Sequence, residues 1–261
     1  MLAELSVLAP GGVEQVDGED FVEFAIYGAE GELPGLGEVE ATLGDSRVTL
    51  TATVVDEDWE LRWKEFHQPV TVHSATGGSS LWVGPPWRER PDGPSLVIDP
   101  GMAFGTGAHP TTRLSLSFLL DLAERGAAEG SLLDLGSGSG ALAIAAGMLG
   151  FGPVTAADSE PAAIEATSLN ATLNGTTPEV LRLDLRTDPI PEARTVVANL
   201  TGPLLETLAG RLEGGNLPAR IACSGFLDAE RDKVGDRFGR LGFRVAASAG
   251  IHGWAGLLFE S

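Results

Sequence analysis

The sequence predicts an α/β protein in which a small α+β domain precedes a doubly wound, mostly parallel sheet. Three patterns favour this architecture. From residue 95 onward, short apolar runs alternate with helical stretches, as in a parallel sheet that helices cover on both faces. A glycine-rich turn follows the first strand of this sheet. Before residue 56, β-branched and aromatic residues occur in short separate segments, which indicates a smaller unit of another type.

The first domain is expected to span residues 1–55 and to contain helices and strands in turn. Met1–Ala9 is apolar enough for a short helix, and β-branched and aromatic residues predict strands at 21–27 and 47–55. A further helix is expected at 32–43, weakened by a proline and two glycines.

Residues 56–66 predict an amphipathic helix. Trp59, Trp63 and Phe66 lie at i, i+4 and i+7, which places them on one face. Packing between two domains is the simpler role for this face, and binding of a partner is the alternative.

The connection between the domains is placed at 56–75 and the second domain at 76–261. Proline and glycine interrupt regular structure through 71–95, where only 81–83 has the pattern of a short strand.

About seven strands are expected in the second domain. The first five are the apolar runs at 131–135, 154–158, 180–183, 195–199 and 220–223. Helices are expected at 141–149 and 161–174, the second beginning with a proline and ending at Asn-Gly. The last two strands, 243–247 and 254–259, leave no room for a crossover helix and are therefore expected to be antiparallel.

Composition excludes several classes of protein. The chain has 261 residues and a net charge of −20, whereas proteins that bind nucleic acid usually carry a basic surface. Its one cysteine, Cys223, cannot form an intramolecular disulfide and is expected to be a core thiol in a reducing compartment. No run of 18 apolar residues and no signal peptide is visible. We expect a soluble cytoplasmic protein with no direct nucleic-acid or membrane partner.

The negative charge is concentrated near the start of the chain. Residues 1–70 hold 16 acidic and 3 basic residues, and residues 71–261 hold 21 and 14. Such an acidic segment attracts a basic partner over about a Debye length, roughly 8–10 Å. The alternative is a general acidity that only favours solubility.

The most informative short motif is the glycine turn at 132–140. Gly136, Gly138 and Gly140 allow a tight turn, and the following helix points its N-terminus at any ligand bound there. Asp158 ends the next strand, 22 residues after Gly136, where an acid can accept both hydroxyls of a ribose. The glycine spacing alone leaves a nicotinamide cofactor open, and Asp158 has the alternative role of a helix N-cap.

A longer motif lies upstream at Gly101–Thr112. Its sequence, Gly-Met-Ala-Phe-Gly-Thr-Gly-Ala-His-Pro-Thr-Thr, resembles at every fixed position the signature of the PrmA family, the methyltransferases of the large-subunit ribosomal protein L-eleven. The likeness continues in 57–69, 133–140, Asp158 and 197–204, and so covers about residues 56–261.

This resemblance implies a Rossmann-like seven-stranded methyltransferase sheet and a protein N-methyltransferase that uses S-adenosylmethionine (AdoMet). The implied substrate is a basic ribosomal protein, methylated on lysine or α-amino nitrogens. The first 55 residues would be the substrate-recognition domain, a ferredoxin-like domain shortened at its start.

The resemblance also assigns roles to single residues. Asn199 is the expected catalytic residue, placed where cofactor and acceptor amine meet, and an acid at the position of Asp134 is common in AdoMet methyltransferases. The expected cofactor-binding residues are Phe104, Thr106, Gly107, Thr111, Thr112, Asp134, Gly136, Gly138, Asp158 and Asn199.

Alternatives remain at this level. Thr111 and Thr112 can instead simply cap a helix that begins near Thr111, and His109 is expected to be a neutral histidine at the helix entry rather than a base. His67 and His252 are isolated, so no metal site is expected. The rival functions are an AdoMet-dependent methyltransferase of another protein or of a small molecule, and a non-catalytic AdoMet-binding module.

Overall fold

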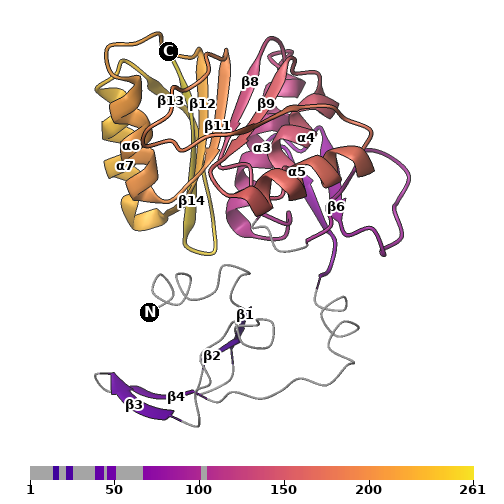
Figure 1. The fold of residues 1–261 in the computed structure, drawn as a ribbon, viewed down its shortest axis with the longest axis vertical. Coiled ribbons are helices and arrows are strands. Elements are labelled where there is room, and N and C mark those ends of the chain that lie inside the picture. Colours follow the sequence, from indigo (N-terminus) through magenta and orange to yellow (C-terminus); the bar gives the residue numbers. More distant parts are fainter. Residues whose placement is uncertain (1–13, 18–21, 26–38, 44–45, 51–66, 101–104) are drawn as a thin grey trace. The chain divides into compact units, whose positions relative to one another are not determined.

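A computed structural model describes residues 14–17, 22–25, 39–43, 46–50, 67–100 and 105–261, the first four of these ranges by their backbone alone. The chain divides into two compact units, Met1–Phe66 and His67–Ser261. Figure 1 shows the elements of both units.

The described part of the first unit consists of two antiparallel strand pairs. β1 (Glu14–Asp17) pairs with β2 (Val22–Ala25), and β3 (Val39–Leu43) pairs with β4 (Ser46–Leu50). β2 and β4 lie within the strands predicted at 21–27 and 47–55, except that β4 begins one residue earlier. β1 was not predicted.

The helix predicted at 32–43 is wrong at its end, because residues 39–43 form β3. Valine, alanine and leucine alternate there with glutamate and threonine, which is the period of a strand. Gly44-Asp45, between the two paired strands, is a dipeptide that favours a hairpin. The predicted helices at Met1–Ala9 and 56–66 lie outside the described residues.

The second unit contains the predicted seven-stranded sheet, with strand order β10-β9-β8-β11-β12-β14-β13. Its strands are β8 (Leu132–Leu135), β9 (Val154–Asp158), β10 (Glu179–Arg182), β11 (Thr195–Asn199), β12 (Arg220–Leu227), β13 (Arg244–Ile251) and β14 (Trp254–Glu260). All pairings are parallel except those of β14, which is antiparallel to β12 and β13. The mostly parallel sheet and the antiparallel last pair are thereby confirmed.

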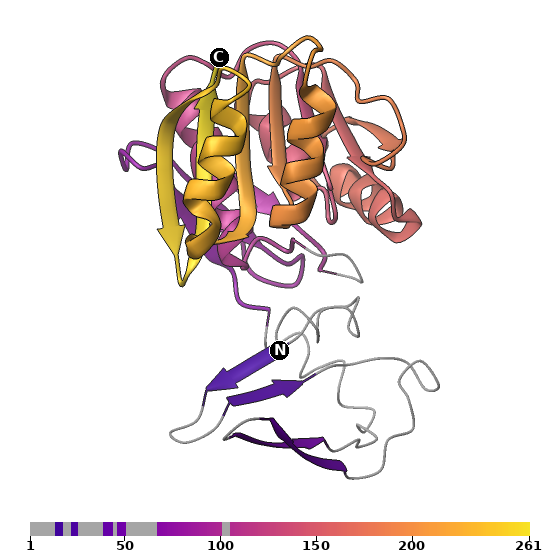
Figure 2. The ribbon, with the colours of Figure 1, turned by 90° about the vertical axis from the view of Figure 1, so that its left-hand side faces the viewer.

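Helices cover both faces of this sheet (Figures 1 and 2). One face carries α3 (Pro110–Glu124), α4 (Ala141–Leu149) and α5 (Pro161–Leu173), and the other carries α6 (Gly202–Leu212) and α7 (Arg231–Gly239), which a short 3-10 helix, η1 (Asp228–Glu230), precedes. Each face has its own apolar core. This double burial explains why the central strands are apolar on both sides. Cys223 is fully buried on β12, as expected of a core thiol.

A small three-stranded sheet precedes the large one. It consists of β5 (Val70–His73), β6 (Ser80–Gly84) and β7 (Ser95–Val97), with β5 antiparallel and β7 parallel to β6. The short strand predicted at 81–83 is confirmed as β6, whereas β5 and β7 were not predicted. The Asn174 side chain accepts a hydrogen bond from Val97 N at 2.8 Å and donates one to Val97 O at 2.6 Å, which ties β7 to the end of α5.

The strand order reverses between β8 and β11. The chain leaves β8 towards β9 on one side, and leaves β11 towards β12 on the other. Ligands of doubly wound sheets bind at such a switch point, beyond the carboxyl ends of the strands. In the described part of the chain, no helix is both long and apolar enough to cross a membrane.

Candidate functional site

The glycine turn after β8 needs glycine for two separate reasons. Gly136, Gly138 and Gly140 have φ values of 76°, 53° and 82°, which side chains with a Cβ rarely adopt. A Cβ on Gly136 would lie 2.6 Å from the Leu200 side chain, and one on Gly140 would lie 2.9 Å from that of Thr167. The turn therefore brings β8, the N-terminus of α4 and α5 closer together than other residues would allow.

Asp158, at the end of β9, is hydrogen-bonded to the glycine turn. Its Oδ2 accepts from the amide of Gly138 at 3.0 Å, and its Oδ1 accepts from the amide of Glu160 at 3.0 Å. The N-cap of α5 is Glu160, so Asp158 does not take the alternative role of cap. Each carboxylate oxygen keeps a further lone pair, so that Asp158 can still accept hydrogen bonds from two hydroxyls.

Asp134 lies beneath the turn and is fully buried. Its Oδ2 accepts a hydrogen bond from the amide of Ala143 at 3.0 Å, while its Oδ1 is buried and has no partner among the described residues. Burial raises the pKa of Asp134 to about 7; the Ala143 amide opposes this rise and the charge of Asp158 adds to it. Asp134 thus anchors the first turn of α4 and presents one unsatisfied oxygen.

The predicted loop residues before α3 differ in what they do. Phe104 lies outside the described residues, and Thr106 is half-buried. Gly107 is buried with a φ of 95°, and a Cβ there would collide with Val83 of β6, so this glycine serves packing on the small sheet. Gly105 O accepts a hydrogen bond from Ser139 Oγ at 2.8 Å, which joins the loop to the glycine turn.

Thr111 does not take the alternative role of a helix cap, and Thr112 does not cap α3 either, because the helix begins at Pro110 and its N-cap is His109. The Nδ1 atom of His109 accepts from the amide of Thr111 at 3.3 Å and lies 2.8 Å from the Thr111 hydroxyl. Burial lowers the pKa of His109, which favours the neutral ring expected of a helix-entry histidine. The Thr111 hydroxyl is therefore engaged with the cap.

The structure brings Thr112, Gly136 and Asn199 together. They help to line a narrow cavity of about 20 Å³ at the switch point, together with Gly105, Ser137, Ala141 and Leu142. Nδ2 of Asn199, at the end of β11, donates to the Thr112 hydroxyl at 3.4 Å. Side chains from a strand end and a helix start thus meet at the turn.

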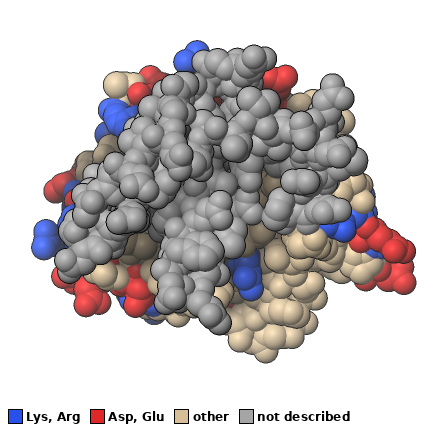
Figure 3. Space-filling view, turned by 90° about the horizontal axis from the view of Figure 1, so that it is seen from below, with Lys and Arg blue, Asp and Glu red and all other residues tan. Residues whose placement is uncertain are grey.

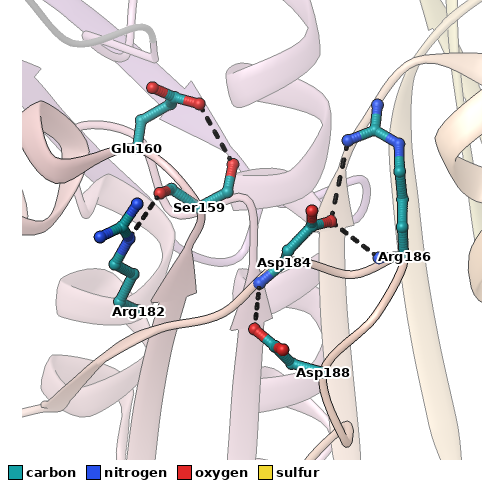
Figure 4. Close-up of a pocket in the computed structure, with 6 residues that line it drawn as sticks. All are labelled: Ser159, Glu160, Arg182, Asp184, Arg186 and Asp188. Carbon is teal, nitrogen blue, oxygen red and sulfur yellow. Dashed lines mark hydrogen bonds and ion pairs between the residues drawn. The ribbon is translucent and has the colours of Figure 1, made fainter.

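A larger cavity of about 420 Å³ lies next to Asp158, at the carboxyl ends of β9 and β10 (Figure 4). It is lined by Ser159, Glu160, Arg182, Asp184, Arg186 and Asp188. Arg182 Nε donates to Ser159 O at 3.2 Å, and Arg186 lies 3.7 Å from Asp184 in an ion pair. The sequence analysis did not predict this cavity. The residue that could have indicated it is Asp184, the acid that follows β10.

On the face seen in Figure 3, both acidic and basic side chains of the described residues are visible along the margin. No group of three or more potential metal ligands occurs within the described ranges.

The strand order, the glycine turn and the acid that ends β9 define a Rossmann-like fold of the nucleotide-binding class. Residues 28–261 match the family model described as ribosomal protein L11 methyltransferase (PrmA). The chain belongs to this family.

Individual relatives support the assignment. The chain is 40% identical over 211 residues to a ribosomal protein L11 methyltransferase of Chromohalobacter salexigens, in an alignment that covers 77% of this chain and 66% of the relative. It is 40% identical over 218 residues to a protein of the same name from Parasynechococcus marenigrum, covering 78% and 72% of the two chains. The chain thus spans about two thirds of the length of these curated relatives.

A solved structure shares the fold. The crystal structure of a ribosomal protein L11 methylase from Lactobacillus delbrueckii subsp. bulgaricus superimposes with a TM-score of 0.61 at 29% sequence identity. The superposition covers 69% of this chain and 94% of that one. The family resemblance and the Rossmann-like methyltransferase fold that the sequence predicted are confirmed.

Proposed function

We propose that this protein is an AdoMet-dependent N-methyltransferase that methylates lysine or α-amino groups of a large-subunit ribosomal protein, L11 by its relatives' names. The observation that carries the proposal is the meeting of Thr112, Gly136 and Asn199 at the switch point, in a chain of this family. Asp158 stands beside them on the next strand, bonded to the glycine turn.

The residues at the switch point fit the proposed cofactor. AdoMet supplies, when bound, an electrophilic methyl group on its sulfonium sulfur. Asp158 has free lone pairs for the ribose hydroxyls, and the neighbouring cavity beyond β10 gives room for the base. The hydroxyl of Thr112 and the N-terminal end of α3 suit a carboxylate, and the orphaned Oδ1 of Asp134 suits a donor such as an ammonium.

Asn199 is proposed to orient the acceptor amine. Its Oδ1 atom keeps a lone pair that can accept an N–H of the incoming nitrogen and so hold the nitrogen lone pair in line with the methyl group. Methyl transfer is a direct displacement, so alignment can supply much of the rate enhancement. A lysine must first lose its proton, which removal from water favours. We assign no general base.

The proposed partner is a basic protein. Residues 1–70 carry a net charge of −13, and ribosomal proteins are basic, so that long-range attraction would favour encounter. On this charge we propose the N-terminal part as the recognition domain. We likewise propose a cytoplasmic location without membrane or direct nucleic-acid partners.

The test is incorporation of labelled methyl groups. Purified ribosomal proteins, including L11, are incubated with the full chain and labelled AdoMet, and modified sites are mapped by mass spectrometry. Methyl groups on lysine or α-amino nitrogens of one protein support the proposal, and the Asn199→Ala variant should lose this activity. Absence of label from every ribosomal protein would overturn the substrate assignment.

The rival functions give different results in the same assays. A methyltransferase of another protein or small molecule would consume AdoMet with other acceptors and would not need residues 1–55. A non-catalytic binding module would lose ligand binding in Asp158→Ala, while Asn199→Ala would change no methylation. A nicotinamide enzyme would bind NAD rather than AdoMet in isothermal titration.

A further inference from the structure

Behind Asn199 lies a chain of buried hydroxyl groups that no pattern in the sequence had pointed to. The Ser224 hydroxyl donates to Asn199 Oδ1 at 3.1 Å, and it lies 2.7 Å from the hydroxyl of Ser115 on α3. Ser115 and Ser224 are both fully buried. Asn199 in turn donates through Nδ2 to Thr112, one helical turn before Ser115. The four side chains thus form a chain of three hydrogen bonds that links α3, β11 and β12.

The direction of the hydrogen bonds in this chain follows from the number of hydrogens that each side chain can donate. A serine hydroxyl has one hydrogen, so Ser224, which gives it to Asn199, must accept the hydrogen of Ser115. Thr112 accepts from Asn199 and keeps its own hydrogen for another acceptor. In the reverse arrangement the Asn199 amide is rotated so that its oxygen faces Thr112. The oxygen would then accept the hydrogen of the Thr112 hydroxyl. A Thr112 that donates to a bound carboxylate therefore selects the observed direction.

The backbone places Ser224 for this contact. Asn199 and Ser224 are direct partners in the parallel register of β11 and β12, and the amide of Leu200 donates to Ser224 O at 2.9 Å. The next residue, Gly225, has a φ of 92°, at a bulge in the pairing with β14. A Cβ on Gly225 would lie 2.8 Å from Asn199 Oδ1, so any residue other than glycine would displace this oxygen. The oxygen is confined by backbone on one side and by Ser224 on the other.

We propose that Ser224, supported by Ser115, is a positioning residue that fixes the rotation of the Asn199 side-chain amide, so that its oxygen faces the acceptor amine. When Thr112 donates to a carboxylate, the Ser224 hydroxyl must donate to the Asn199 oxygen, and this bond holds the oxygen in place. Without the Ser224 hydroxyl no bonded donor holds the oxygen, and an orientation in which an NH₂ group replaces it becomes accessible. A buried hydroxyl is costly unless bonded, and these two serines bond only to each other and to Asn199 among the described side chains. The inference rests on the proposed function, because it deepens the role given there to Asn199.

The test compares Ser224→Ala and Ser115→Ala with Ser74→Ala in the full chain. Ser74 is also buried and hydrogen-bonded, but to Glu124, away from the switch point, so it controls for loss of a buried hydroxyl. We expect Ser224→Ala to lower kcat for methyl transfer about 10-fold or more, with the AdoMet Kd within threefold of wild type. Ser115→Ala should lower kcat by less, and Ser74→Ala should keep it within twofold. Ser224→Cys, with its weaker donor, should give an intermediate rate, which a purely structural role would not produce.

A second readout does not depend on activity. The side-chain amide resonances of Asn199, identified by their loss in Asn199→Ala, should shift or split in Ser224→Ala and stay unchanged in Ser74→Ala. A kcat of Ser224→Ala equal to that of Ser74→Ala, or unchanged amide resonances, would overturn the inference. If wild type methylates no ribosomal protein, the proposed function fails, and the amide resonances alone decide whether Ser224 positions Asn199. If Ser224→Ala does not fold, Ser115→Ala and Ser224→Cys are judged by the same two readouts.

Discussion

The carboxylate of Asp158 accepts a hydrogen bond from the backbone amide of Gly138 at 3.0 Å, so the acid that ends β9 is joined directly to the glycine turn that follows β8. The two motifs lie 20 residues apart in sequence. Their contact means that a change at Asp158 acts on both the proposed ribose site and the turn. A charged hydrogen bond of this kind contributes about 1.5–3 kcal/mol.

Substitution of Asp158 should therefore weaken cofactor binding strongly. In Asp158→Ala we expect the AdoMet Kd, measured by isothermal titration, to rise at least about 10-fold, since the charged hydrogen bonds of the ribose are lost. Asp158→Asn keeps an oxygen for the Gly138 amide, and its AdoMet Kd should lie between those of wild type and Asp158→Ala. Asp228→Ala removes an exposed acid paired with Arg231 and is the control. An unchanged Kd in Asp158→Ala would exclude this acid from the site.

Gly140 should not tolerate a side chain. Gly140→Ala combines a φ of 82° with a Cβ 2.9 Å from Thr167, so we expect a loss of about 2–4 kcal/mol in the free energy of unfolding. Gly147→Ala is the matched control, because Gly147 lies inside α4 with nothing within 4 Å of its Cβ position. It should stabilise the protein by up to about 1 kcal/mol. Urea denaturation measures both, and equal effects of the two substitutions would contradict the prediction.

Asp134 should make the protein less stable as the pH rises. Its pKa is about 7 in the folded protein against 3.8 for an ordinary aspartate, so the unfolded chain ionises first as the pH rises between these values. The contribution of Asp134 to stability then falls by about 1.4 kcal/mol per pH unit over that range and stays level above it.

Asp134→Asn should remove this dependence. The difference in unfolding free energy between variant and wild type, measured in urea at pH 5 and pH 8, should favour the variant more at pH 8, by about 2.6 kcal/mol. Asparagine can still accept from the Ala143 amide through its oxygen, so the anchor on α4 is kept. A difference that is the same at both pH values would show that Asp134 is ionised throughout.

Glu124, in contrast, should make the protein less stable as the pH falls into the acid range. Hydrogen bonds from Ser74 first, and also from Thr76, lower the pKa of this carboxyl from 4.5 to about 2. The stability that this provides is complete above pH 4.5 and is lost as the pH falls towards 2.

Glu124→Gln should therefore flatten the acid limb of a plot of Tm against pH between 5 and 2.5. Ser74→Ala, which removes the main cause of the lowered pKa, should flatten it in part. Acid limbs that coincide for wild type and Glu124→Gln would refute the role given to this carboxyl, which joins α3 to the segment between β5 and β6.

Much of the second unit could be predicted because its signals are local. Parallel strands buried on both faces must be apolar, and the turns between them need glycine, so runs such as 154–158 and 195–199 indicate strands by themselves. The same reasoning failed at 39–43, where a short alternating segment competed with a helical interpretation. β5 and β7 were missed because they are only four and three residues long and lie in a stretch rich in proline and glycine.

The sequence by itself determined the family, the order of the strands in the second unit's large sheet along the chain and the residue types at the switch point, because these depend on patterns along the chain. Only the tertiary structure decided which of those residues meet. It engages Thr111 with the His109 cap and turns Thr112 towards Asn199, and it brings Ser115 and Ser224 together although they are 109 residues apart. The physical reason is that a hydrogen bond between distant residues depends on strand register and helix rotation, which long-range packing sets and no local pattern records.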